Sequence, residues 1–133
     1  MSNTDAKFID PIFRKDHPMV LAKNRHQASF LPVLLPYSAT DYQAGTVMAR
    51  NTVSGLYTRY VNGGASGTGT AVGVLFEDRI VEDFASTGAT ATARVIVKGE
   101  LFQSQLIGLD SGAITNMNGK SYTDAFGIQI LSI

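Results

Sequence analysis

The chain has 133 residues, of which 44% are apolar and 17% charged, and its 11 basic side chains balance 11 acidic ones. This length suits a single domain, and the apolar content argues against intrinsic disorder. A neutral chain lacks the basic excess with which nucleic-acid-binding proteins neutralise phosphates, so we expect no nucleic-acid partner. Because cysteine is absent, disulfides, thiolate chemistry and cysteine-based zinc sites are excluded.

No apolar run approaches the roughly 20 residues that a membrane-spanning helix needs. The longest run, residues 30–37, is interrupted by Pro32 and Pro36. The first residues, MSNTDAKF, lack the apolar stretch of a secretory signal. We therefore expect a soluble protein that is made in the cytoplasm and has no membrane partner.

Proline and glycine divide the chain into two parts. All four prolines lie within residues 1–36, and all 13 glycines lie from Gly45 onward. Proline suits extended or edge-lying chain, whereas glycine supplies the positive φ of tight turns. The pattern predicts an extended N-terminal arm over residues 1–44 and a compact, turn-rich body over residues 45–133.

The predicted arm combines charged with apolar side chains. Residues 1–27 contain five basic and three acidic side chains and both histidines, and residues 30–37 are apolar. In one interpretation the first part is flexible and the second packs on the body; in the other, the arm lies across a partner. The apolar side chains of the first part are unusual for a linker and are the candidate contact residues. They are Phe8, Ile9, Ile12, Phe13, Met19, Val20 and Leu21.

The first half of the body predicts three short strands. Residues 46–50 and 56–61 are rich in β-branched and aromatic side chains, and the turn residues at 51–55 between them predict a hairpin. The continuous apolar run at residues 71–76 predicts a strand that is buried on both faces or lies at a subunit contact.

A further strand is predicted at residues 91–98, where side chains alternate. The small and apolar Ala91, Ala93, Val95 and Val97 share one face of it.

After Gly99, residues 100–107 predict another strand, and residues 128–133 predict the last one. One or two short helices are expected, over residues 110–117 or 121–126. The sequence of short strands and turns predicts a mainly β fold, a small antiparallel barrel or sandwich.

No pattern in the chain predicts catalysis or a cofactor. The glycine-rich residues 62–70 lack the Lys–Ser/Thr pair of a phosphate-binding loop, and a predicted strand rather than a helix follows them. His17 and His26 lie in the arm, which offers no rigid partner to orient a catalytic base. The acidic residues within 77–83 lack the spacing of a calcium loop, so we expect a solvated turn around Arg79 rather than a metal site.

Five short segments of the body stand in a suggestive order: GTVMAR at 45–50, GLY at 55–57, GTAVGVLFEDRIV at 69–81, ARVIVKGEL at 93–101 and FGI at 126–128. Their order and spacing resemble the lambda-type head decoration proteins of tailed bacteriophages. The resemblance covers residues 45–133, and the arm is longer than that of the lambda prototype.

The resemblance implies a structural protein without enzymatic activity or cofactor. Such proteins form trimers on the outer surface of the expanded head, at three-fold and quasi-three-fold positions between capsomers of the major capsid protein. They stabilise the shell against the pressure of packaged DNA, and their N-terminal segments become ordered by pairing with coat strands. We therefore expect a homotrimer whose arm contacts the capsid.

Two assignments stay open at the level of the sequence. Val72, Val74 and Phe76 are candidates for the trimer interface, with packing in the chain's own core as the alternative. A different virion module, such as a tail- or fibre-associated domain that binds a host surface, would need exposed aromatic side chains. The tyrosines available for it are Tyr37, Tyr42, Tyr57, Tyr60 and Tyr122.

Overall fold

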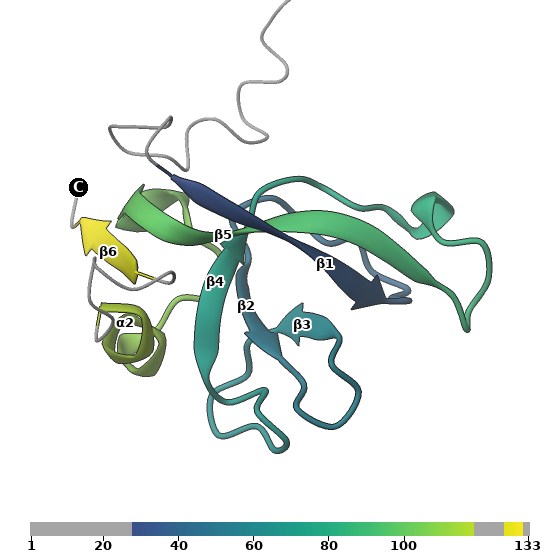
Figure 1. Ribbon diagram of the computed structural model, residues 1–133, viewed down its shortest axis with the longest axis horizontal. Helices are drawn as coiled ribbons and strands as arrows, with labels where there is room; N and C mark the ends of the chain where they lie inside the picture. The colour runs from purple at the N-terminus through teal and green to yellow at the C-terminus, as the bar shows by residue number, and fades with distance from the viewer. Residues whose placement is uncertain (1–27, 119–126, 132–133) are drawn as a thin grey trace, which may run out of the picture.

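The computed structural model describes residues 28–118 and 127–131, and in this part of the chain six strands form one sheet beside a single α-helix (Figure 1). The strands are β1 (Ser29–Pro36), β2 (Val47–Arg50), β3 (Tyr57–Arg59), β4 (Ala71–Leu75), β5 (Thr90–Phe102) and β6 (Gly127–Leu131). The helix is α2 (Ser111–Asn118), and two 3-10 turns, η3 (Val81–Asp83) and η4 (Gln103–Gln105), flank β5. The predicted mainly β class and the short helix near residues 110–117 are confirmed; the alternative helix at 121–126 lies outside the described residues.

The sheet has the order β1-β5-β4-β2-β3, with every neighbouring pair antiparallel. β6 departs from this pattern, because it pairs in parallel with the end of β5, from Lys98↔Gly127 to Phe102↔Leu131. Within the described residues β1 pairs only with β5, and β3 pairs only with β2. The sheet is therefore open at both edges and is not closed into a barrel.

β1 is built from the second part of the predicted arm. Its eight residues pair with β5 from Ser29↔Lys98 to Pro36↔Thr90. Proline is tolerated on an edge strand because the missing N–H can face away from the neighbouring strand. Pro32 and Pro36 accordingly lie on this edge. The division into an arm and a body at residue 44 stays a prediction, but residues 29–36 belong to the sheet.

β5 is longer than predicted. A break at Gly99 was expected, with a new strand over residues 100–107, but one strand runs from Thr90 to Phe102 and then enters η4. Gly99 adopts φ +147°, which a residue without a Cβ accepts at little cost. At Lys98 the strand that pairs with β5 changes. β1 pairs with the residues of β5 up to Lys98, and β6 pairs with those from Lys98 onward. The glycine therefore marks a change of neighbour rather than the end of a strand.

Two clusters of buried side chains cover the two faces of β4 and β5. The predicted face of β5, with Ala91, Ala93, Val95 and Val97, lies in one cluster together with Leu75, Met48 and Phe84. The other cluster joins Ile96 and Val74 to the helix residues Ala113 and Met117 and to Ile128 of β6. Of the two expectations for residues 71–76, burial within the chain describes all of them except the half-buried Val72, and a subunit contact stays a prediction.

The close approach of β4 to β5 explains the glycine within the run AVGVL. A Cβ on Gly73 would lie 2.5 Å from Val95 Cγ1 and 2.7 Å from the Ile96 carbonyl oxygen. Only glycine leaves enough room for the two backbones at this point.

The helix α2 is held at its start by one carboxylate. Asp110 Oδ1 accepts hydrogen bonds from the Ala113 N–H at 2.8 Å and from the Tyr60 hydroxyl at 2.9 Å. A carboxylate before the first turn satisfies a backbone donor that the helix cannot satisfy itself. Asp110 therefore also ties α2 to the residue that follows β3.

Candidate functional site

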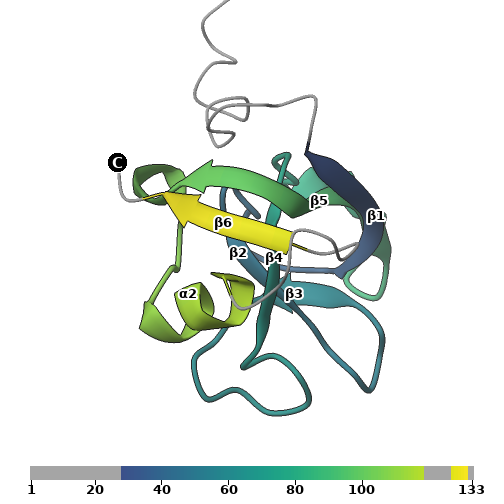
Figure 2. The same ribbon diagram turned by 60° about the vertical axis from the view of Figure 1, so that its left-hand side comes forward.

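The molecule has two dissimilar ends. In Figures 1 and 2, β1 begins at the upper end and β4 finishes there, whereas the β2–β3 hairpin loop and the glycine-rich loop between β3 and β4 project at the lower end. The two lower loops are tied together, because the Thr52 N–H donates to the Ser66 carbonyl at 2.8 Å.

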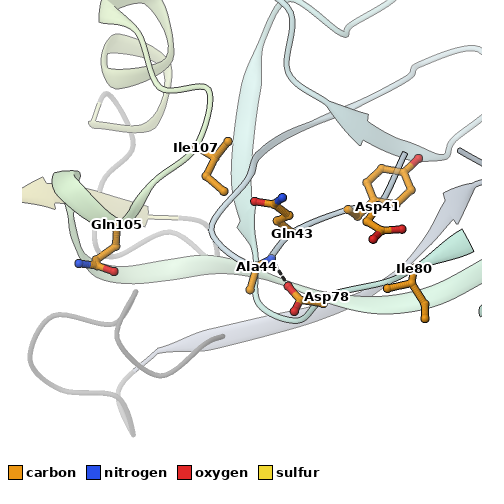
Figure 3. Close-up of a pocket in the computed structure, with 8 residues that line it drawn as sticks. Asp41, Gln43, Ala44, Asp78, Ile80, Gln105 and Ile107 are labelled. Carbon is orange, nitrogen blue, oxygen red and sulfur yellow. Dashed lines mark hydrogen bonds between the residues drawn. The ribbon is translucent and has the colours of Figure 1, made fainter. Parts of the chain in front are cut away.

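A depression of about 340 Å³ lies near the end of β4 (Figure 3). Three segments that are far apart in the chain line it: residues 41–44, the turn after β4, and the end of η4 with the loop that follows it. The lining residues are Asp41, Tyr42, Gln43, Ala44, Asp78, Ile80, Gln105 and Ile107.

Backbone hydrogen bonds fix the walls of this depression. Tyr42 and Arg79 exchange N–H···O bonds of 2.8 and 2.9 Å, which join residues 41–44 to the turn after β4. The Ile107 N–H donates to the Gly45 carbonyl at 2.9 Å, and the Gly45 N–H donates to Leu75, the last residue of β4, at 2.8 Å. The depression is therefore formed by the fold itself rather than by side chains that could rotate away.

Carboxylates at the depression cap backbone groups. Asp78 Oδ1 accepts the Ala44 N–H at 2.7 Å (Figure 3), Asp41 Oδ1 accepts the Val81 N–H at 3.3 Å, and Asp83 Oδ2 accepts the Ile80 N–H at 2.8 Å. None of the three forms an ion pair with a residue in 28–118 or 127–131. They organise the turn without an ion pair in the described part of the chain, while the Arg79 and Arg59 guanidinium groups donate to the backbone carbonyls of Asp78 and Asp41.

Glu77 behaves differently from these carboxylates. It pairs with Arg94 at 3.1 Å and with Arg79 at 3.5 Å, and it also accepts the Arg94 backbone N–H. Burial alone would raise the pKa of Glu77, but the hydrogen bonds and charges of Arg94 and Arg79 outweigh it and lower that pKa. The predicted turn around Arg79 is present, and its arginine neutralises only one of the acidic residues.

Two isoleucines at the depression are exposed to solvent. Ile80 is 41% and Ile107 is 43% exposed, although most large apolar side chains of the described residues are buried. Beside them, Tyr42 is fixed: its hydroxyl donates to the Pro36 carbonyl at 2.8 Å, and the Arg59 guanidinium lies 4.2 Å from its ring centre. Burial raises the pKa of Tyr42, and the charge of Arg59 opposes that shift. The depression therefore combines a fixed Tyr42 with two apolar side chains that no other described residue covers.

A second, more apolar groove of about 300 Å³ lies between the two edges of the open sheet. Its lining comes from β1, from the start of β3 and the loop before it, and from Thr92 of β5. The lining residues are Leu31, Pro32, Val33, Leu34, Gly55, Tyr57 and Thr92.

The residues singled out from the sequence are spread over the molecule. Val74 and Phe76 are buried in the core cluster that contains Met117, and Val72 is half-buried against the opposite cluster. Val74 and Phe76 thus pack in the chain's own core. That Val72, Val74 and Phe76 lie at a trimer interface stays a prediction. All seven candidate contact residues of the arm lie outside the described residues.

The tyrosines form no exposed aromatic patch in the part of the chain that the structure describes. Tyr42, Tyr57 and Tyr60 are buried, and Tyr37 is half-buried against Phe84. Tyr122 lies outside the described residues.

In the same described part, no three His, Asp or Glu side chains come together as a metal site. No helix among these residues is long and apolar enough to span a membrane. The described residues form a β domain with two surface hollows.

Comparison with known protein families identifies the family to which this chain belongs. The family model of the bacteriophage lambda head decoration protein D matches residues 19–118, about three quarters of the chain. The chain therefore belongs to this family of head decoration proteins. No curated protein matches the chain.

Membership makes this protein a structural, non-enzymatic component of a phage capsid. The resemblance to the family is thereby confirmed over four of the five segments, since FGI at 126–128 lies beyond the match, and the match extends it upstream, across β1, to residue 19. The depression beside Ile80 and Ile107 was missed by sequence reasoning. Its one signal was an isoleucine inside the acidic run EDRIVED, at residues 77–83.

Proposed function

We propose that this protein is a cementing protein that binds the outer surface of the expanded phage head as a homotrimer, at three-fold and quasi-three-fold positions, and stabilises the shell. Its partner there is the major capsid protein, and the protein is made in the host cytoplasm before it attaches. The observation that carries the proposal is the match to the head decoration family over residues 19–118.

The fold supports a structural role of this kind. β1 ties the start of the described chain to the centre of the sheet through its pairing with β5. A pull on the residues before Ala28 is therefore transmitted to the whole sheet rather than to a loose end. The arm residues from Phe8 to Leu21 are the proposed capsid contacts, added to strands of the coat protein by main-chain hydrogen bonds.

A trimer presents three such arms to one site. Linked contacts raise the effective concentration of each arm once the first has bound, so overall affinity exceeds that of a single arm by about 10²-fold or more. Slow release follows from this linkage even where each arm binds weakly.

The test is co-sedimentation of the purified protein with expanded heads, unexpanded heads and free coat subunits. We expect binding to expanded heads alone, a native mass of three chains, and heads that withstand higher temperature with the protein bound. Heads that rupture at the same temperature with and without bound protein contradict the stabilising role. Electron microscopy that places the protein on the tail would favour a tail-associated module instead.

The arm is tested by a truncation that removes residues 1–27 and leaves β1 complete. We expect the shortened protein to keep its fold and native mass but to lose head binding. A matched control replaces the polar Ser2, Asn3 and Thr4 by alanine and leaves the apolar arm residues in place. Equal binding of the truncated and full-length proteins contradicts the role of the arm.

A further inference from the structure

We propose that the depression between residues 41–44, the turn at 78–80 and Ile107 is a second docking site for the major capsid protein, one that receives a coat loop carrying a lysine or arginine next to an aliphatic side chain. This inference rests on the proposed function and adds to it a contact made by the body of the protein, independent of the arm.

The charge of the depression selects a cationic partner. Asp41 and Asp78 line it, and Asp83 follows in the adjoining turn. Each uses an oxygen to cap a backbone N–H, and none forms an ion pair within the described residues. A carboxylate already held by a backbone donor loses little side-chain freedom when a cation arrives, which favours a charge-assisted hydrogen bond there.

The apolar surface of the depression selects an aliphatic neighbour for that cation. Ile80 and Ile107 are exposed on walls that belong to different segments, and both line the same hollow. The stem of a lysine or arginine can cover such surface while its charged end reaches the carboxylates. Burying the two side chains adds a hydrophobic contribution to the electrostatic one.

The position of the depression suits contact with the shell. The Gly45 N–H bonds to Leu75, the last residue of β4, so the depression lies at the end of the molecule where β4 finishes (Figures 1 and 2). β1 begins at the same end, and the proposed capsid-binding arm precedes it. The arm and the depression could therefore contact the shell from the same end of the body.

A second copy of the chain is the less suitable occupant, because its arginines near this end are already engaged. Arg79 donates to the Thr92 carbonyl and pairs with Glu77, Arg94 also pairs with Glu77, and Arg59 donates to the carbonyls of Thr40 and Asp41. We therefore assign the depression to a coat loop, which would supply a positive charge to its carboxylates.

The test uses charge introduced on exposed apolar residues at the two ends of the molecule. The depression variant is Ile80→Lys with Ile107→Lys, and the control variant is Val53→Lys with Val61→Lys, whose valines are 83% and 57% exposed at the lower end. Both variants add two positive charges, so they differ only in place. Circular dichroism, thermal unfolding and native mass check that each variant folds and assembles as the unaltered protein does.

We expect the depression variant to bind expanded heads about tenfold or more weakly, because like charges repel the incoming cation, and the control variant to bind within about twofold of the unaltered protein. Raising NaCl from about 50 to about 300 mM should weaken the binding of the unaltered protein and should weaken that of Asp41→Asn less.

Three results overturn the inference in distinguishable ways. Equal binding of the depression and control variants, with the arm truncation still defective, contradicts the second site and leaves the proposed function standing. A depression variant that loses its native mass assigns the surface to a second copy of the chain. An unaltered protein that ignores expanded heads contradicts the proposed function and the inference with it.

Discussion

The interior of the sheet and the depression at its upper end both contain aliphatic side chains, which are buried in the interior and exposed at the depression. Val74 is fully buried on β4, and six residues later Ile80 faces solvent beside the depression. Leu101 is fully buried near the end of β5, and six residues later Ile107 is exposed on the opposite wall. Each strand thus supplies the core, and the turn after it supplies the surface. Stability and binding should therefore respond to different residues of one segment.

The largest loss of stability is expected from Leu101→Ala. Removing a fully buried leucine side chain should lower the free energy of unfolding by about 2–5 kcal/mol, since both burial and packing are lost. Urea denaturation of this variant and of Ile107→Ala provides the comparison, and the exposed isoleucine should cost about 0.5 kcal/mol or less. Similar losses in the two variants would contradict the division between interior and surface.

Gly73→Ala should cost about 1–3 kcal/mol, because the added methyl group would meet the Ile96 carbonyl oxygen and force β4 and β5 apart. Gly88→Ala is the matched control, since a Cβ there meets nothing within 4 Å. It should be neutral or raise stability by a few tenths to about 1 kcal/mol, through a less flexible unfolded chain. Thermal unfolding of both variants decides whether the close approach of the two strands limits this position.

The effect of Glu77→Gln should depend on pH. The pKa of Glu77 is lower in the folded chain than in the unfolded one, so its contribution to stability is present above the unfolded pKa of about 4.3 and is lost as pH falls through the folded pKa. We expect a contribution of about 1 kcal/mol or less, because the pair is partly exposed.

Urea denaturation of the unaltered protein and of Glu77→Gln, at pH 7 and at about pH 3, measures this contribution. The difference between the two should shrink on acidification. Glu82→Gln is the control, since Glu82 is exposed and forms no ion pair with the described residues. A difference that grows at low pH would reverse the sign of the proposed coupling.

The smallest effect on stability is expected at the surface of the depression. Ile80→Ser should change the free energy of unfolding by about 0.5 kcal/mol or less, as is usual for exposed positions. Its binding to expanded heads should nevertheless fall, in contrast to Leu101→Ala, whose folded fraction should bind normally. A loss of stability at Ile80 comparable to that at Leu101 would show that the depression is part of the core.

Local patterns in the sequence were sufficient for most of the strands. The alternation from Ala91 to Val97 predicted which side chains share a face, and the apolar run at 71–76 predicted burial on both faces. Gly99 misled the prediction because a glycine inside a strand and a glycine at its end look alike in sequence. β1 was not predicted as a strand because prolines weaken the pattern, and only its place at the sheet edge makes them acceptable.

Contacts between distant segments were beyond the reach of these patterns. The parallel pairing of β6 with β5 joins residues nearly 30 positions apart, and no local signal specifies it. The depression likewise depends on three segments that meet through backbone bonds of Tyr42, Gly45 and Ile107. The family, in contrast, could be inferred from the order of short segments, four of which lie within the matched residues 19–118 and contain β2, β4 and most of β5.

The most direct test of the account is electron cryo-microscopy of expanded heads, imaged with and without the purified protein. We expect added density on the outer surface at the three-fold and quasi-three-fold positions, with the start of β1 and the depression facing the shell. Density on the tail, or heads that look the same in both samples, would contradict the account.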